Sequence, residues 1–560
     1  MAGRKLIGRE IKAGSRWRRI SRRIRSAISA EPVVGADASV WSILCVREPP
    51  TRPRSAERAR GATSAWRPRI SGIAARAAIR KAGLFLTAAS VLSACGGSGG
   101  VKKSPLSLLG LGQAARTGYV GTVVADEPIA ALAAHDVLLR GGNAADAAAA
   151  LGLALSVTLP SRASLGGGGA CLAWKPGDRD GGRAFLFLPT GDAPQDAQQA
   201  SASRADRPAS APMLARGLYL MQIRYGSVDF ADLTRPAISL ARAGFEVSGQ
   251  LAADLSVVQA PLLADDGARA VFGRADGSAL KAGDILRQPR LAGSLERIRS
   301  GGVGDLYTGA LGQTLVAASN AAGGGLTMAG LRGALPASVA PLTVTSGNVS
   351  VSFLPPPADG GYGAAVAWLG LANGQGSSSR GRQAVAAWRA SEAGGSVSTQ
   401  SARAEALLSS GHAPASGGTL PSLPASTSFA VVDRDGESVA CALTMNNLFG
   451  TGRMAGSTGI VLGASAAHKP GPLLAAAIAH RRADVFLAAS AASGQADAAD
   501  AAAAALTGAL GGNVKAMSPT TEAGRANAIS CPGGLPGEGE HCRGWTDPRG
   551  GGYVSASDGS

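Results

Sequence analysis

Residues 426–444 read STSFAVVDRDGESVACALT, two apolar runs on either side of a charged turn. The runs, 428–432 and 438–443, are rich in residues that favour strands, and the turn between them contains an Asp-Gly step. Such a step between two β-rich runs is a strong local signal for a β-hairpin. The stretch therefore predicts two antiparallel strands, with Ser426 at the start of the first one.

The chain upstream of this hairpin alternates between extended and helical patterns. A strand is predicted over 120–125, and a helix over 128–139 has proline in its first turn, where proline is tolerated. Asn143 is placed to cap a second helix over 144–155. The apolar strands expected after it cover 170–174 and 184–188. Helices followed by paired strands indicate a layered α/β (α+β) fold.

Four later segments are assigned from their composition. Residues 225–247 have a helical pattern, and the three consecutive prolines within 354–361 require a rigid loop. Residues 371–425 are rich in Ser, Gly and Ala, which favours an exposed connection. Residues 484–512 are rich in Ala, which favours a helix.

Length and charge limit the classes of protein that fit. The chain has 560 residues, 45% of them hydrophobic, which is enough for one large or two medium domains. Residues 1–81 hold 20 Lys and Arg against 5 Asp and Glu, a net of +15, whereas 82–560 hold 35 against 33, a net of +2. The basicity thus belongs to a leader, and the body lacks the basic stripe of a nucleic-acid-binding protein. We expect no nucleic-acid partner.

The first 118 residues divide into three parts ahead of the folded body. Residues 1–81 are basic without an apolar period, and are either a disordered tail or sequence upstream of the true start. Residues 82–95 contain a short apolar run that ends in Leu-Ser-Ala-Cys, which resembles a bacterial lipoprotein signal with Cys95 as the lipidated residue. Residues 96–118 form a linker rich in Gly and Ser.

This signal also decides the expected location of the protein. A lipidated Cys95 predicts a periplasmic protein that is anchored to a membrane of the bacterial envelope by its lipid. The alternative for 82–95 is a buried apolar helix that ends in a free thiol.

The sequence offers no motif for a metal ion or a cofactor. Its histidines form neither H-E-x-x-H nor a zinc pattern with cysteine, and they lie at positions 135, 412, 468, 480 and 541. The glycine run 166–169 lacks the Lys-Ser/Thr of a phosphate-binding loop. We interpret it as a tight turn or a close approach of two backbones, and we expect no cofactor.

Several motifs occur together in a fixed order along the body. They are GGNAADAA at 141–148, PSRASLGGGG at 160–169, PPPADGG at 355–361, VVDRDG at 431–436 and DPR at 547–549. This set resembles the gamma-glutamyltransferase (glutathione hydrolase) family of N-terminal-nucleophile hydrolases, over about residues 119–560. The resemblance implies a four-layer αββα fold.

The same resemblance implies self-cleavage. Members of the family cut their own precursor and use the Thr at the new N-terminus as nucleophile, with the free α-amine as its base. Ser426 occupies that position, so we expect cleavage between Ala425 and Ser426 into a large-subunit-like region, 119–425, and a small-subunit-like region, 426–560. Each fragment would then be the partner of the other. Thr427 is the alternative nucleophile, although strand alternation directs its side chain to the opposite face. Otherwise Ser426 merely begins a strand.

Two residues downstream match further family positions. In the family, the residue at Thr444 supports the nucleophile and the residue at Asn446 binds the glutamyl group, and both follow the hairpin in register. The resemblance therefore assigns Ser426 and Thr444 as catalytic and Asn446 as substrate-binding. Thr and Asn at a strand end also commonly bond to local backbone, which is the alternative.

Other positions depart from the family pattern. The Arg that binds the substrate carboxylate is absent before 193–194, and the Asp that binds the amine is absent after 459–462. The paired Ser is replaced at 474–476, and the Gly pair of the oxyanion hole is replaced near 489–494. Charge-assisted hydrogen bonds contribute roughly 1.5–3 kcal/mol each, so a normal gamma-glutamyl substrate should bind poorly.

Two functions remain open on the sequence alone. The first is a gamma-glutamyltransferase-like acyltransferase or amide hydrolase that acts through an acyl-enzyme on small gamma-glutamyl compounds, or on other amides if its specificity has changed. The second is a non-catalytic envelope lipoprotein that has kept the fold, because a fold can outlive its chemistry.

The cysteines of the body give two expectations. Cys531 and Cys542 lie in a Pro- and Gly-rich segment and would pair in an oxidising compartment, or else remain separate thiols. Cys171 and Cys441 each lie in an apolar strand, and we interpret both as core residues.

Overall fold

The computed structural model describes residues 118–189, 207–376, 379–391, 393–411, 420, 426–465, 471, 473–513, 524–537 and 541–556. The expected leader, the lipidation site Cys95 and the residue before the expected cleavage, Ala425, lie outside these ranges. So do the segments 190–206 and 466–470, which include two of the positions that depart from the family pattern.

The hairpin predicted over 426–444 lies at the centre of a seven-stranded antiparallel sheet. Its strands are β9 (Ser426–Asp433) and β10 (Ser438–Thr444), and their register places Ser426 opposite Thr444. The strand order is β17-β1-β9-β10-β2-β3-β6. The other strands are β1 (Gly121–Ala125), β2 (Gly168–Trp174), β3 (Arg183–Phe187), β6 (Ala337–Val339) and β17 (Tyr553–Ala556).

A second sheet has six strands in the order β16-β15-β14-β13-β8-β7. Its strands are β7 (Leu342–Ser346), β8 (Val349–Phe353), β13 (Ala475–Arg481), β14 (Val485–Ser493), β15 (Arg525–Leu535) and β16 (Arg543–Thr546). Two short ribbons pair β4 (Phe245–Glu246) with β5 (Ile285–Leu286), and β11 (Met454–Ala455) with β12 (Ile460–Val461).

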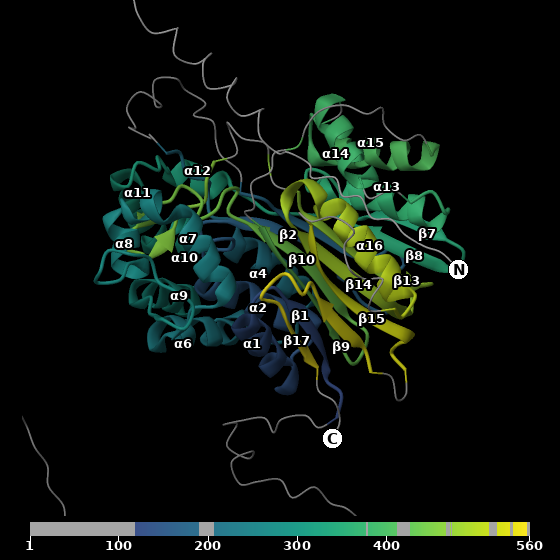
Figure 1. Cartoon of the computed structure of the whole chain (residues 1–560), viewed down its shortest axis with the longest axis horizontal. Coiled ribbons are helices and arrows are strands. Elements are labelled where there is room, and N and C mark those ends of the chain that lie inside the picture. The colour runs from purple at the N-terminus through teal and green to yellow at the C-terminus, as the bar shows by residue number, and fades with distance from the viewer. Residues whose placement is uncertain are drawn as a thin grey trace, which may run out of the picture. The chain divides into compact units, whose positions relative to one another are not determined.

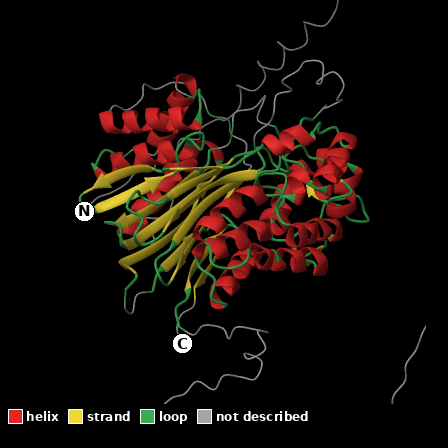
Figure 2. Cartoon of the chain, turned by 180° about the vertical axis from the view of Figure 1, so that it is seen from behind, coloured by secondary structure: helices red, strands yellow, loops and turns green. Residues whose placement is uncertain are grey.

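Side chains of β9 alternate between two hydrophobic layers, as strand geometry requires. Phe429 and Val431 pack into a core beside helices, whereas Ala430 and Val432 belong to a different core that also holds Ile478 of the second sheet. The two sheets therefore pack face to face, and Figure 2 shows their strands stacked between helices. This is the expected four-layer αββα arrangement.

Helices cover the outer face of each sheet (Figure 1). The helices against the first sheet are α1 (Pro128–Leu139), α2 (Ala144–Thr158) and α4 (Leu214–Tyr225), and those beside the second are α13 (Gly360–Ala372), α14 (Arg380–Ser391), α15 (Val397–Ser410) and α16 (Ala498–Leu510). The remaining helices are α5 (Phe230–Leu233), α6 (Arg235–Ala243), α7 (Gly249–Leu263), α8 (Asp266–Phe272), α9 (Pro289–Gly301), α10 (Asp305–Thr308), α11 (Ala310–Ala321), α12 (Met328–Gly333) and the short η3 (Gln495–Asp497).

The turn of the β9–β10 hairpin anchors the start of α2. Asn143 caps this helix as predicted, because its side chain accepts a hydrogen bond from the backbone of Asp146. The carboxylate of Asp433 accepts the N–H of Ala144 at 2.9 Å, and Glu437 accepts the N–H of Ala145 at 3.2 Å. Two acids from the hairpin thus satisfy backbone donors that a helix start leaves without partners.

Three segments differ from the sequence-based expectation. Residues 225–247 are not one helix, because α4 ends at Tyr225 and the short α5 and α6 follow. The expected connection 371–425 contains α14 and α15. In 484–512 only the second half is helical, since Val485–Ser493 is the strand β14, paired on both sides. Pairing with two neighbours overrides the helix propensity of its alanines.

Both cysteine pairs of the body are joined by disulfide bonds. Cys531 is bonded to Cys542, the pair that we expected to form in an oxidising compartment. Cys171 and Cys441 are buried core residues, but they are also bonded to each other, which the sequence analysis did not predict. They lie directly opposite on β2 and β10, a pairing that only the register of the sheet reveals.

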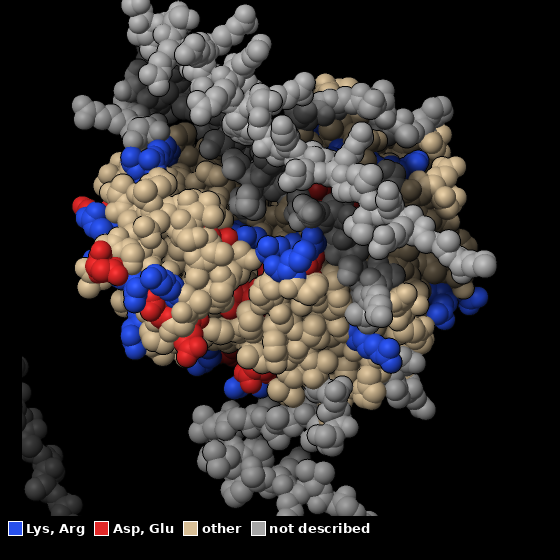
Figure 3. Space-filling model, viewed as in Figure 1, with Lys and Arg blue, Asp and Glu red and all other residues tan. Residues whose placement is uncertain are grey.

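Charged side chains of both signs are interspersed over the face in Figure 3. This distribution agrees with the small net charge of residues 82–560. Of the described helices, none is long and apolar enough to cross a membrane. Within the described ranges, no three His, Cys, Asp or Glu side chains are grouped so that they would hold a metal ion.

Candidate active site

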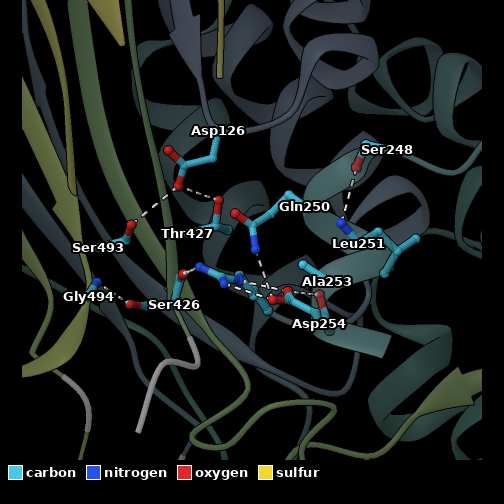
Figure 4. Close-up of polar contacts among 12 residues, drawn as sticks. Asp126, Ser248, Gln250, Leu251, Ala253, Asp254, Ser426, Thr427, Ser493 and Gly494 are labelled. Carbon is cyan, nitrogen blue, oxygen red and sulfur yellow. Dashed lines mark hydrogen bonds and ion pairs between the residues drawn. The ribbon is translucent and has the colours of Figure 1, made fainter. Parts of the chain in front are cut away.

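Ser426 lies between the two sheets, at the first residue of β9. It is 1% exposed, and its hydroxyl accepts a hydrogen bond from the backbone N–H of Gly494 at 3.4 Å. Gly494 follows the last residue of β14 and has a φ of 90°, which glycine adopts readily. The Gly494 N–H is therefore directed at the Ser426 hydroxyl from the opposite sheet (Figure 4). Gly494 is in the segment where the sequence indicates loss of the family's Gly pair.

Thr427, the alternative nucleophile, points to the other face of β9. Its hydroxyl donates to a carboxylate oxygen of Asp126 at 2.9 Å. Ser428 returns to the face of Ser426, and its hydroxyl donates to the carbonyl of Ala491 in the second sheet. The alternation expected from the sequence thus separates the two candidate hydroxyls.

Asp126 connects the strands around the candidate nucleophile. It follows β1, and besides the Thr427 hydroxyl it accepts the N–H of Ser428 at 2.9 Å and the amide of Asn527 at 2.8 Å. The hydroxyl of Ser493, next to Gly494, lies 3.4 Å from the same carboxylate. One acid therefore links β1, β9, β14 and β15 beside Ser426. The sequence analysis did not identify Asp126 as a site residue, because the residues that bind it are 301 to 401 positions away in the sequence.

Arg162, inside the motif PSRASLGGGG, makes contact with Ser426. Its Nη1 donates to the backbone carbonyl of Ser426 at 3.2 Å, and its Nε and Nη2 donate to the two carboxylate oxygens of Asp254, each at 2.8 Å. Arg162 is 7% exposed and Asp254 is 4% exposed. Burial alone lowers the pKa of the Arg162 guanidinium, but the hydrogen bonds and charge of Asp254, with Asp126 nearby, raise it overall. The guanidinium is therefore a fixed positive charge beside the nucleophile.

Sequence reasoning did not single out Arg162 or Asp254. The signal that was present is a lone charged residue in an otherwise apolar and glycine-rich stretch. A buried arginine requires a partner of opposite charge. Which residue is that partner depends on how α7, which carries Asp254, packs against the rest of the fold.

Of the two residues assigned downstream of Ser426, the hairpin register brings Thr444 to it. Thr444 is directly opposite Ser426, and its hydroxyl oxygen accepts the backbone N–H of Asn446 at 2.9 Å. Asn446 has a φ of 60°, and its side-chain nitrogen donates to the carbonyls of Pro189 and Ala464. Both hydrogens of the Asn446 amide are thus used to hold neighbouring loops. Pro189 and Ala464 are 257 and 18 residues from Asn446, so these contacts differ from the local backbone bonds that the sequence analysis named as the alternative.

The glycine run 166–169 allows close approach of neighbouring backbones. A Cβ at Gly166 would lie 2.3 Å from the carbonyl oxygen of Val461, and one at Gly168 would lie 2.1 Å from that of Phe187. A side chain does not fit at either position. The run therefore brings β2 against its neighbours and has the structural role expected for it.

The positions 474–476, where the family's paired Ser is replaced, are apolar in the structure. Leu474 is fully buried, and Ala475 begins β13 inside the second sheet. The backbone after β12 instead pairs with the segment 208–210 through Gly463 and Ser465. These observations place no charged group at the 474–476 positions.

Comparison with known proteins agrees with this geometry. A family model described as gamma-glutamyltranspeptidase matches residues 130–393. The glutathione hydrolase proenzyme of Escherichia coli (strain K12) is 29% identical over 383 residues, which cover 61% of this chain and 65% of that protein. These matches support the gamma-glutamyltranspeptidase family for this chain. Glutathione hydrolase 3 of Arabidopsis thaliana is 35% identical over 248 residues, 43% of this chain and 39% of the relative.

The matches to these two family members span less than two thirds of each relative's length. A solved structure, the cephalosporin acylase from Bacillus halodurans, aligns with 79% of this chain and 97% of its own at a TM-score of 0.60 and 18% identity. At that identity the alignment supports the N-terminal-nucleophile hydrolase fold alone. Activity and substrate therefore have to be argued from the site.

Proposed function

We propose that this protein is a self-processing acyltransferase or amide hydrolase in which Ser426 is the nucleophile. The observation that carries this proposal is the position of Ser426, which begins β9 between the sheets with its hydroxyl against the Gly494 N–H. Thr444 lies opposite, where the family resemblance assigns the residue that supports the nucleophile.

The processing step follows from this position. The Ser426 hydroxyl attacks the carbonyl carbon of Ala425, the peptide C–N bond breaks, and the nitrogen takes up the hydroxyl proton. Water then hydrolyses the resulting ester, which leaves a carboxylate on Ala425 and a free hydroxyl and α-amine on Ser426. The new amine is the base that the nucleophile needs, so no histidine is required.

Turnover uses the same atoms. The α-amine of Ser426 takes the hydroxyl proton while the oxygen attacks the amide carbonyl of the substrate, and the departing amine leaves with that proton. An acyl ester remains on Ser426. Water releases it as an acid, whereas an acceptor amine releases it as a new amide.

We expect the substrate to be a small amide. Members of the family act on gamma-glutamyl compounds such as glutathione. The absence of the family's Arg before 193–194 and of its Asp after 459–462 favours an acyl group without the full zwitterion of glutamate. Each lost charge-assisted bond would remove roughly 1.5–3 kcal/mol of binding. We therefore expect uncharged or singly charged acyl groups to react better than gamma-glutamyl groups.

N-terminal sequencing of the purified full chain, after a reducing denaturing gel, tests the proposal. The expected result is two bands, the smaller of which begins at Ser426, together with hydrolysis of an amide from a panel that includes glutathione and neutral acyl anilides. A single intact band from folded protein would contradict it. That outcome would support the second candidate, a non-catalytic envelope protein, which the apolar substitutions at 474–476 favour.

The location is a separate part of the proposal. The Leu-Ser-Ala-Cys sequence at 92–95 supports a lipid anchor on Cys95 and a place in the periplasm. Mass spectrometry of the mature N-terminus should find a lipid-modified Cys95. Release of the protein into the soluble periplasmic fraction by Cys95→Ala would agree, and an unmodified N-terminus upstream of Cys95 would contradict the anchor.

A further inference from the structure

The first residues of β9 extend beyond the strand that pairs with the rest of it. The register of β1 with β9 ends at Ala125 and Phe429, so Ser426 lies three residues past the last pair. At this edge side chains provide the missing hydrogen-bond partners. The Asp126 carboxylate accepts the N–H of Ser428, and the Arg162 guanidinium donates to the carbonyl of Ser426.

The Arg162 guanidinium is held in one orientation. Two of its nitrogens bind the two oxygens of Asp254, a planar fork-to-fork contact. Asp254 also accepts the hydroxyl of Ser161 at 2.7 Å and the amide of Gln250 at 2.9 Å. Gln250 in turn accepts a hydrogen bond from Arg525 at 2.6 Å. Figure 4 shows Asp254 and Gln250 on the side of Ser426 opposite to Gly494.

This arrangement fixes Ser426 from two directions. The Gly494 N–H contacts the hydroxyl, and Arg162 contacts the backbone carbonyl of the same residue. In an extended strand, the N–H and C=O groups of one residue point to the same edge. The nitrogen of Ser426, which leaves the scissile bond in the proposed processing, therefore lies on the edge that Arg162 occupies.

We propose that Arg162, clamped by Asp254, is a positioning residue that holds Ser426 in the orientation required for self-cleavage and turnover. This inference rests on the proposed function of Ser426. A 1 Å displacement of a reacting group can lower a rate by about 10²-fold, so the contact matters even though Arg162 does not touch the substrate. A merely structural ion pair would affect folding but not the chemistry.

The test separates stability from positioning. The double variant Arg162→Met with Asp254→Asn removes both charges and retains a carbonyl oxygen for Ser161 and Gln250. Replacing a buried ion pair by uncharged residues of similar size is often neutral for stability. We expect a folded protein that processes on the order of 10²-fold more slowly. The fraction that matures should have a lower kcat and an unchanged KM.

A matched control exists elsewhere in the chain. Arg389 binds Asp359 through two nitrogens at 2.5 and 2.7 Å, and its Nη1 donates to the carbonyl of Gly471 at 2.8 Å. The same replacement there, Arg389→Met with Asp359→Asn, removes an equivalent pair that has no contact with Ser426. It should leave the rate of processing and kcat at the wild-type values.

If the double variant does not fold, the single variant Arg162→Lys tests the inference instead. Lysine keeps the charge beside Asp254, but its single ammonium cannot reproduce the planar fork. It should process at a rate between the wild type and the double variant. Processing and kcat at wild-type values in both Arg162 variants would overturn the inference while the proposed function stands. A wild-type chain that never matures would overturn both.

Discussion

The hydroxyl of Ser426 and the backbone N–H of Gly494 are joined by a hydrogen bond of 3.4 Å that connects the two sheets. Ser426 begins β9 in the first sheet, and Gly494 follows β14 in the second. The surroundings of the candidate nucleophile therefore depend on the face-to-face packing of two sheets. The substitutions below test what each side contributes.

Removal of the Ser426 hydroxyl should abolish processing. Ser426→Ala leaves no nucleophile, so a reducing gel should show one band where the wild type shows two. Ser426→Thr keeps a hydroxyl on Cβ and should therefore still give both bands. Thr427→Val tests the alternative nucleophile, whose hydroxyl binds Asp126. Loss of processing in Thr427→Val, with retention in Ser426→Ala, would reverse the assignment.

Gly494→Ala should slow processing and turnover. The φ of 90° at this residue disfavours any side chain by about 1–2 kcal/mol, and relaxation of the strain would move the N–H away from Ser426. Gly374→Ala is a matched control, because Gly374 has a φ of 68° with open space around it. Thermal unfolding should show a similar loss of stability in both variants. Equal rates of processing in the two would show that the Gly494 contact is dispensable.

The Cys171–Cys441 disulfide should tether the two fragments after cleavage. Cys171 precedes the expected cleavage site and Cys441 follows it, so the bond crosses between the fragments. A processed chain should therefore run as one band without reductant and as two bands with it. The double variant Cys171→Ala, Cys441→Ala should give two bands under both conditions.

The second disulfide supplies the control for this experiment. Cys531 and Cys542 both follow the cleavage site, so their removal should leave the non-reduced band intact. Two bands from the wild type without reductant would show that the Cys171–Cys441 bond does not link the fragments.

The stability of the fold should fall as the pH rises through the neutral range. Burial, together with the charge of Asp433, raises the pKa of Glu437 to about 9, and burial raises the pKa of Asp433 to about 6. Between the ordinary pKa of a glutamate and about 9, the folded state binds more protons at Glu437 than the unfolded state. The free energy of unfolding then decreases with pH, by up to about 1.4 kcal/mol per pH unit for this group.

Glu437→Gln should remove most of this dependence, because a glutamine is never ionised. It should raise the unfolding temperature at pH 8 relative to the wild type and have little effect at pH 5. Glu405→Gln, at an exposed position on α15, is the control and should change neither value. An unfolding temperature of the wild type that is constant or increases from pH 5 to 9 would contradict the prediction.

Local patterns predicted much of the framework. The Asp-Gly turn predicted β9 and β10, and Asn143 predicted the start of α2, because turns and caps are determined by residues close in sequence. The prediction failed at Val485–Ser493, where alanines with high helix propensity form a central strand. Pairing with β13 and β15 decided that segment, and such pairing is not visible in a short window of sequence.

The sequence by itself determined the family motifs, which are short and follow one another in a fixed order, and the hairpin, which depends on residues close in sequence. The resemblance to the family then assigned the candidate residues Ser426, Thr444 and Asn446. Only the tertiary structure brought Gly494 and Arg162 to Ser426, from 68 and 264 residues away. It also joined Cys171 to Cys441. The physical reason is that the Gly494 contact requires the two sheets to pack together, the orientation of Arg162 requires Asp254 of α7, and the disulfide requires the register of β2 with β10. Packing and register are properties of the whole fold rather than of any local pattern.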